Sequence, residues 1–223
     1  MKEALRESLR SGVQLALAAL MATALLAGTF ALTRGRIAES EHRARTDALA
    51  IVIPAGRYDN DLVADTITVA AEPWLGQPAS TVHRARLGGR DAALVLSVVA
   101  PDGYSGDIAL LVAVDRRGRV VGVRVSGHRE TPGLGDDIEV GRSDWITRFT
   151  GRSLGDPDAA RWAVRKDGGD FDQFAGATVT PRAVVAAVKR CLEFVARHGD
   201  ALYAAAPGAT LRIDSAPDDY RPQ

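Results

Sequence analysis

Hydrophobic residues form one long, uninterrupted block near the start of the chain. No charged residue occurs from Ser11 to Thr33, and the block is rich in alanine and leucine. It is long enough to cross a bilayer core of about 30 Å, whereas the apolar part of a secretory signal peptide usually spans about 7–15 residues. We therefore predict a retained transmembrane helix. Cleavage at the small-residue site Thr29-Phe30-Ala31 is the alternative that this pattern leaves open.

Shorter apolar runs follow the block. Residues 34–50 are charged and lack Gly or Pro after Gly35, which predicts a juxtamembrane helix. Runs rich in valine and leucine predict strands at 92–100, 107–115 and 120–125, with a hairpin turn at Arg116-Arg-Gly118. Trp145 and Phe149 lie four residues apart in a predicted helix over 143–150, a spacing that favours core packing. A short strand is predicted from Trp162 through Val164.

The last regular pattern is an apolar stripe at helical spacing, formed by Val184, Val185, Val188, Leu192 and Val195. Pro181 suits the first helical position and Thr180 the N-cap position before it. Cys191 lies within this helix, which favours a small buried residue over a nucleophile. Residues 207–223 are polar and predict a frayed end.

These elements predict an α+β chain, in which a single N-terminal transmembrane helix is followed by an antiparallel-sheet domain with flanking helices. We expect an N-terminal segment and membrane helix at 1–35, a folded domain at 36–205 and a flexible tail at 206–223.

Composition excludes several classes of protein. The 223 residues include 28 basic and 28 acidic residues, for a formal net charge of +0, so nothing suggests a basic nucleic-acid surface. Because there is one cysteine, an intramolecular disulfide and a cysteine-rich metal or iron–sulfur site are excluded. The other histidines show no ligand spacing around His128, so we predict no metal site.

Charge near the hydrophobic block does not settle its orientation. The basic residues are balanced across it, with Lys2, Arg6 and Arg10 before it and Arg34, Arg36, Arg43 and Arg45 after it. That balance does not favour either direction under the positive-inside rule.

The stretch from Asp172 to Pro181 combines a glycine-containing loop with the start of the last helix. Thr178 lies just outside the predicted helix N-terminus, where partial positive charge and unpaired N–H groups suit a phosphate. Gly176 and Ala177 lack bulk and permit a ligand to approach closely. From spacing alone, an ordinary capped helix after a tight turn remains the competing interpretation.

Two further loops carry unusual residues. Gly103-Tyr-Ser-Gly106 is a tight loop, and residues 126–136 contain three glycines and a proline, which forbid a regular element. Ser126 and His128 lie two residues apart without a nucleophile elbow, which argues against a hydrolase. No Gly-x-Gly-x-x-Gly motif follows a strand, so a nicotinamide site is not predicted.

The motif Asp172-x-x-Ala-Gly-Ala-Thr178 resembles the flavinylation signature of two families, RnfG of Rnf-type complexes and its sister subunit in the Na⁺-pumping NADH:quinone reductase. Ala175 stands in place of the usual Ser or Thr. The loop around Glu130, the Gly103–Gly106 loop and the segment 51–61 resemble RnfG in the same order. We therefore interpret the chain as similar to the RnfG family. The alternatives are a protein like the quinone reductase subunit and a non-redox module that helps assemble a membrane complex.

The resemblance implies FMN joined covalently to Thr178 through its phosphate, attached by a separate flavin transferase that uses FAD and a divalent cation. It also implies an inner-membrane protein with a cytoplasmic N-terminus and a periplasmic FMN-binding domain, in a complex that couples ferredoxin- and NAD-linked electron transfer to ion translocation. The chain would be an electron carrier with no catalytic residue of its own. The remaining expected cofactor-binding residues are Asp172, Ala175, Gly176, Ala177, Tyr104, Ser105, Glu130, Thr131, Gly133 and Leu134.

Overall fold

A computed structural model of the chain describes residues 2–214 and 217. It divides into two units, Met1–Arg45 and Thr46–Gln223. The first consists of most of helix α1 (Lys2–Ala50), which continues through the predicted juxtamembrane segment. The helix contains an 18-residue window with a mean hydropathy of 2.1, none of it buried, and is long and apolar enough to cross a membrane. The domain limits expected at 35 and 205 stay predictions.

The second unit is built on a six-stranded sheet. Its strands are β1 (Thr66–Ala70), β2 (Ser80–Leu87), β3 (Arg90–Ala100), β4 (Ile108–Asp115), β5 (Val120–Gly127) and β6 (Thr210–Arg212). They lie in the order β5-β4-β3-β2-β1-β6. Neighbours pair antiparallel except β6, which runs parallel to β1. The α+β class is confirmed, with a sheet that is mixed rather than purely antiparallel.

The predicted strands and their hairpin turn are confirmed as β3, β4 and β5. The Asp115 carboxylate closes the turn by accepting the N–H groups of Arg117 and Arg119 at 2.8 and 2.9 Å. Strands β1 and β2 have no counterpart among the predicted elements. The frayed end expected over 207–223 is wrong at Thr210–Arg212, because these residues form β6. The tail residues 215, 216 and 218–223 lie outside the described part of the chain.

The helices of the second unit differ in length and type. The α-helices are α2 (Glu72–Leu75) and α3 (Val179–Ala204), and the 3₁₀ turns are η1 (Asp136–Ile138), η2 (Trp145–Phe149), η3 (Ala159–Arg161) and η4 (Arg165–Asp167). The predicted helix over 143–150 is η2, whose Trp145 and Phe149 rings pack edge to face at 5.3 Å. The strand predicted through Val164 is wrong, since Val164 makes only an isolated bridge to Phe171.

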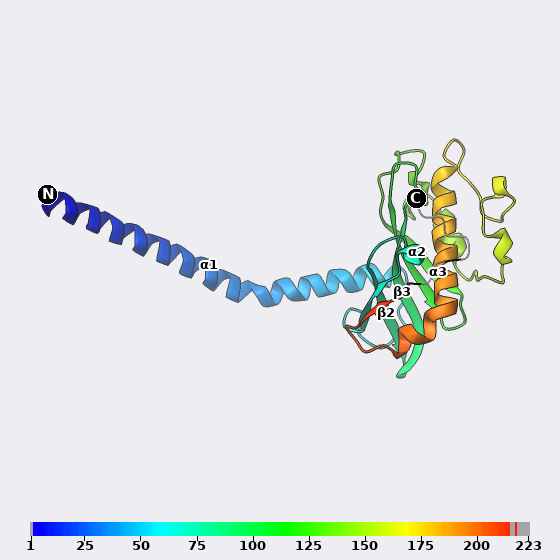
Figure 1. Cartoon of the computed structure of the whole chain (residues 1–223), viewed down its shortest axis with the longest axis horizontal. Coiled ribbons are helices and arrows are strands. Elements are labelled where there is room, and N and C mark those ends of the chain that lie inside the picture. Colours follow the sequence, from blue (N-terminus) through cyan, green and yellow to red (C-terminus); the bar gives the residue numbers. More distant parts are fainter. Residues whose placement is uncertain (1, 215–216, 218–223) are drawn as a thin grey trace. The chain divides into compact units, whose positions relative to one another are not determined.

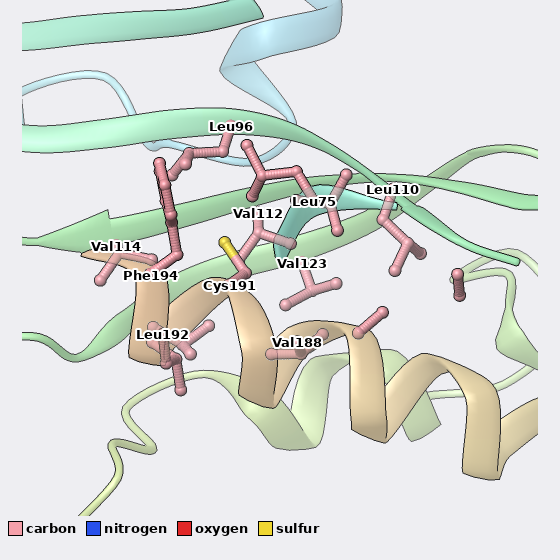
Figure 2. Packing of buried hydrophobic residues seen from close by; sticks show 14 of the residues in the cluster. Leu75, Leu96, Leu110, Val112, Val114, Val123, Val188, Cys191, Leu192 and Phe194 are labelled. Carbon is pink, nitrogen blue, oxygen red and sulfur yellow. The ribbon is translucent and has the colours of Figure 1, made fainter. Parts of the chain in front are cut away.

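Helix α3 covers one face of the sheet (Figure 1). Figure 2 shows the strand side chains Leu96, Leu110, Val112, Val114 and Val123 beside Val188, Cys191, Leu192 and Phe194 of the helix. Cys191 is fully buried, and the loss of solvent raises the pKa of its thiol to about 12. The thiol therefore stays protonated at neutral pH, which confirms the prediction of a small buried residue.

The last turn of α1 and the segment after it cover the opposite face. Leu49, Val52, Ile53 and Leu62 form a second apolar cluster with Ala85, Ala93, Val95 and Ala113 of the sheet. The approach is close at Gly122, where a Cβ would lie 2.4 Å from the carbonyl oxygen of Val52. Because both faces of the sheet are covered, strands β3 and β4 are largely apolar on both faces instead of alternating.

Candidate functional site

The N-terminus of α3 lies one residue past Thr178. The helix begins at Val179 with Thr178 in the N-cap position, and Thr178 makes no side-chain capping bond. The expectation that Thr180 caps the helix is wrong. Thr180 is fully buried, and its hydroxyl donates to the carboxylate of Glu130 instead of accepting a backbone N–H. The prediction that Pro181 opens the helix is also wrong, since it follows Val179 and Thr180 as the third helical residue. It lies within the first turn, where backbone N–H groups have no helical partner.

Glu130 joins three segments that are distant in the sequence. It follows strand β5, and its side chain is 5% exposed. One carboxylate oxygen accepts the backbone N–H of Ser105 at 2.9 Å, and the other accepts the Thr180 hydroxyl. The tight loop at 103–106, the loop at 126–136 and the start of α3 therefore meet at one carboxylate.

Two glycines allow this meeting. A Cβ on Gly103 would lie 2.2 Å from the carbonyl oxygen of Gly106 and 3.0 Å from the carboxylate of Glu130. A Cβ on Gly135 would lie 2.8 Å from the other oxygen of that carboxylate. Any larger residue at either position would push the loops apart, so glycine is required here by close approach.

Internal hydrogen bonds hold the 126–136 loop. His128 accepts the backbone N–H of Glu130 at 3.0 Å through Nδ1, while its Nε2 lies 2.6 Å from the carboxylate of Glu139. The N–H of Gly133 donates to the buried carboxylate of Asp136 at 2.7 Å. The carbonyl of Thr131 accepts the N–H of Leu134 at 3.1 Å. Both ring nitrogens of His128 thus serve to order the loop.

The loop before Thr178 is open to solvent at Ala175 and Gly176. Gly176 has a φ of +78°, which disfavours any side chain there, and the N–H of Ala177 closes the turn by donating to the carbonyl of Phe174 at 3.2 Å. A Cβ placed on Gly176 would lie 3.9 Å from the side chain of Leu134, so this loop and the 126–136 loop are neighbours.

Large apolar side chains are exposed on each of the three segments. Tyr104 is 72% exposed, Leu134 is 47% exposed and Val179 is 39% exposed. Such side chains offer apolar and aromatic surface to a planar ring, and the helix N-terminus beside Thr178 suits a phosphate. The residues present therefore fit a cofactor that carries both a phosphate and a flat ring system.

The carboxylate of Asp172 is held by two arginines. Its carboxylate pairs with Arg148 of η2 and with Arg165 of η4, the latter at 2.9 Å. Its backbone carbonyl accepts the indole N–H of Trp145 at 2.8 Å. Its expected role in cofactor binding stays a prediction, while its visible role is to anchor the start of the loop that leads to Thr178.

The sequence does not reveal what Thr180, Arg148 and Arg165 do at this site. The place of Thr180 before a proline fits a cap, and its true partner lies 50 positions away in the chain. The two arginines lie in irregular segments without periodicity, so no sequence pattern connects them to Asp172.

These features define a domain that presents a threonine, a helix N-terminus and exposed apolar side chains to a phosphate-bearing cofactor, after a helix of membrane-spanning length. Residues 103–193 match the family model of the FMN-binding domain, and residues 1–52 match the RnfG N-terminal region. All three loops of the site lie within the first of these matches.

Curated relatives cover most of the chain. A relative from Pseudomonas aeruginosa (strain UCBPP-PA14) is 49% identical over 200 residues, which are 89% of this chain and 94% of the relative. One from Escherichia coli (strain K12) is 50% identical over 181 residues, or 81% and 87%. One from Vibrio atlanticus (strain LGP32) is 42% identical over 195 residues, or 87% and 93%. Each is named as the G subunit of the ion-translocating oxidoreductase complex.

The chain belongs to this RnfG family and contains its FMN-binding domain. The match of residues 1–52 to the RnfG N-terminal region favours RnfG over the alternative of a quinone reductase subunit.

Proposed function

We propose that Thr178 carries FMN as a covalent phosphoester and that the flavin relays electrons between other redox centres of an ion-translocating membrane complex. The observation that supports this most directly is the position of Thr178. It is the N-cap residue of the 26-residue helix α3, its hydroxyl does not cap that helix, and it follows an exposed loop that contains Gly176.

The linkage requires an external enzyme. Threonine is a poor nucleophile at neutral pH, and among the described residues none makes a hydrogen bond with the Thr178 side chain that would activate it. A flavin transferase would supply FAD, a divalent cation and a base. In that transfer the threonine oxygen would bond to the FMN phosphorus as the bond from that phosphorus to the AMP oxygen breaks. AMP would leave, and the hydroxyl proton would pass to the base.

Once formed, the phosphodiester carries one negative charge beside the N-terminus of α3. A charge at that end of a helix gains a few tenths to about 1 kcal/mol from the aligned backbone dipoles. Glu130 keeps the neighbouring loops at a fixed distance from the helix, and Tyr104 and Leu134 provide exposed surface for the ring. The bound flavin supplies the redox chemistry, because it accepts and donates single electrons.

The proposed setting follows from the relatives. They are named as subunits of an ion-translocating oxidoreductase complex, which implies other subunits as partners. Helix α1 would anchor the chain in the bacterial inner membrane, with residues 34–223 in the periplasm. Covalent attachment makes sense there, since FMN lost outside the cytoplasm is not readily recovered.

Labelling of Thr178 is tested on the full chain produced together with its transferase. The wild type should gain the mass of one FMN less one water, and its yellow fluorescence should survive denaturing gel electrophoresis because a covalent bond does not need the fold. Thr178→Ala should be colourless and unmodified. Gly176→Val should also lose label, because valine is strained at a φ of +78° and adds bulk beside the acceptor.

Thr81→Ala is the matched control, since it removes a hydroxyl from an exposed residue of strand β2, outside the three loops of the site, and should stay fully labelled. A yellow Thr178→Ala variant would move the attachment site elsewhere. A colourless wild type beside an active transferase would contradict the redox proposal and favour a non-redox assembly module.

A further inference from the structure

A cleft of about 440 Å³ lies among the 3₁₀ turns of the second unit. Its lining residues are Arg148, Thr150, Gly151, Arg152, Asp156, Arg165, Asp170 and Phe171. The volume is within the range of small-molecule sites, which is about 300–1,000 Å³. Three guanidinium groups thus line one concave surface.

Among the residues that the structure describes, Arg152 and Arg165 have hydrogen-bonding or ion-pair partners for only a minority of their guanidinium N–H donors. Arg165 makes one ion pair, at 2.9 Å to Asp172. Arg152 makes a single long contact of 3.4 Å to Asp156, whose side chain is 76% exposed. Since each guanidinium carries five N–H groups, the cleft presents a surplus of donors in the planar forks that match phosphate oxygens.

The charges of Arg148 and Arg165 also favour an anion in the cleft. Arg148 and Arg165 share one close carboxylate, that of Asp172. The second carboxylate near Arg148 is that of Asp144, at 4.0 Å and with its side chain 81% exposed, so solvent screens most of its effect. The single charge of Asp172 therefore balances only one of the two arginine charges that it contacts.

Two acidic residues also line the cleft, and neither closes it to an anion. Asp170 pairs most closely with Arg161, outside the set of three cleft arginines, and its charge also interacts with those of Arg152 and Arg165. Asp156 is the carboxylate that opposes an anion beside Arg152, and its exposure allows it to turn away into solvent. An anion that enters the cleft thus meets arginine donors at the cost of one exposed ion pair.

We propose that this arginine cleft binds the phosphate group of a soluble small molecule, at a site separate from Thr178. Arg148, Arg152 and Arg165 donate to the phosphate oxygens, and the Thr150 hydroxyl is the adjacent neutral donor. Arg148 and Arg165 also pair with Asp172, which begins the loop that leads to Thr178. The bound anion and this loop would therefore contact the same two arginines.

The test uses the full chain in detergent, produced without the transferase, so that its outcome does not depend on flavin attachment. Tryptophan fluorescence is followed while inorganic phosphate or AMP is added at constant ionic strength. Trp162 should report binding, because its ring lies 5.0 Å from that of Phe171, which lines the cleft. We expect a saturable change with at least one of the two probes.

Arg152→Gln should weaken binding by at least about tenfold, as expected for the loss of a charge-assisted contact. Asp156→Asn should tighten binding, and a gain of affinity cannot come from misfolding. Arg117→Gln on the β4–β5 turn removes the same charge outside the cleft and should leave affinity unchanged. The proposal is overturned if the wild type shows no saturable binding with either probe, or if Arg117→Gln weakens binding as much as Arg152→Gln does.

Discussion

At the residue scale, the buried carboxylate of Glu130 sets the geometry around Thr178. Its two hydrogen-bond donors are the Ser105 N–H and the Thr180 hydroxyl, and Thr180 is fully buried. A buried carboxylate that loses a donor cannot recover it from water, so the full desolvation cost of that oxygen appears in the stability of the fold.

Thr180→Val should lower the free energy of unfolding by about 1.5–3 kcal/mol, because valine has nearly the same shape but gives Glu130 no donor. Thr180→Ser should lose much less, since it keeps the hydroxyl. Urea unfolding of the full chain in detergent, followed by tryptophan fluorescence, measures both. Equal losses for the two variants would contradict the hydrogen bond to Glu130.

A double-mutant cycle with Glu130→Gln separates this role from helix capping. Neighbouring, hydrogen-bonded residues show non-additive effects, whereas a capping threonine would act independently of Glu130. The sequence predicts that Thr180 matters as an N-cap, since it lies between Thr178, the proposed flavin acceptor, and a proline. It cannot reveal the partner, because a contact across 50 positions depends on how two loops pack.

At the element scale, one buried arginine connects the sheet to the end of α3. Arg84 on β2 is 1% exposed and pairs with Asp65 at 2.5 Å. Its guanidinium also donates to the carbonyls of Tyr203, at 3.1 Å, and Ala205. The last carbonyls of a helix lack partners within it and carry partial negative charge, so a cation there satisfies both needs.

Arg84→Met should destabilise the domain by about 3–5 kcal/mol, because it removes the charge but keeps the apolar stem, and leaves a partly buried aspartate and helix carbonyls without their donor. The matched control is Arg116→Met. Arg116 pairs with Asp200 on the surface, where the side chains are 48% and 90% exposed, so its loss should cost at most about 1 kcal/mol. The same urea unfolding measures both, and similar losses would contradict a structural role for Arg84.

The number of polar residues in each strand and the length of the strand explain which strands the sequence could predict. Strands β3 and β4 are apolar on both faces and stand out in the sequence. Strand β2 contains His83, Arg84 and Arg86, whose polarity hides a strand because their burial depends on partners elsewhere. Strand β6 has three residues and pairs only with β1, so no local pattern could reveal it.

At the scale of the whole molecule, the chain combines a helix that resembles a membrane anchor with a folded domain. The contacts that form the candidate site all lie within that domain. The hydrophobic block predicts the first unit, and the three glycine-rich loops predict where the site lies. Their convergence at Glu130 is a property of the folded domain alone. What the pattern leaves open is the side of the membrane on which that domain lies, since basic residues flank the block on both sides.

We predict that helix α1 is retained and that the domain lies outside the cytoplasm. Long soluble domains translocate largely regardless of flanking charge, so the balance of arginines does not forbid this orientation. Alkaline phosphatase, which is active only in the periplasm, should be active when fused after Gln223 and inactive when fused after Arg10, ahead of the hydrophobic block. A tag at Met1 should remain on the membrane-bound protein, whereas cleavage near Ala31 would release it. Activity from a cytoplasmic reporter alone at the C-terminus would contradict the orientation, and with it the proposed place of flavin attachment.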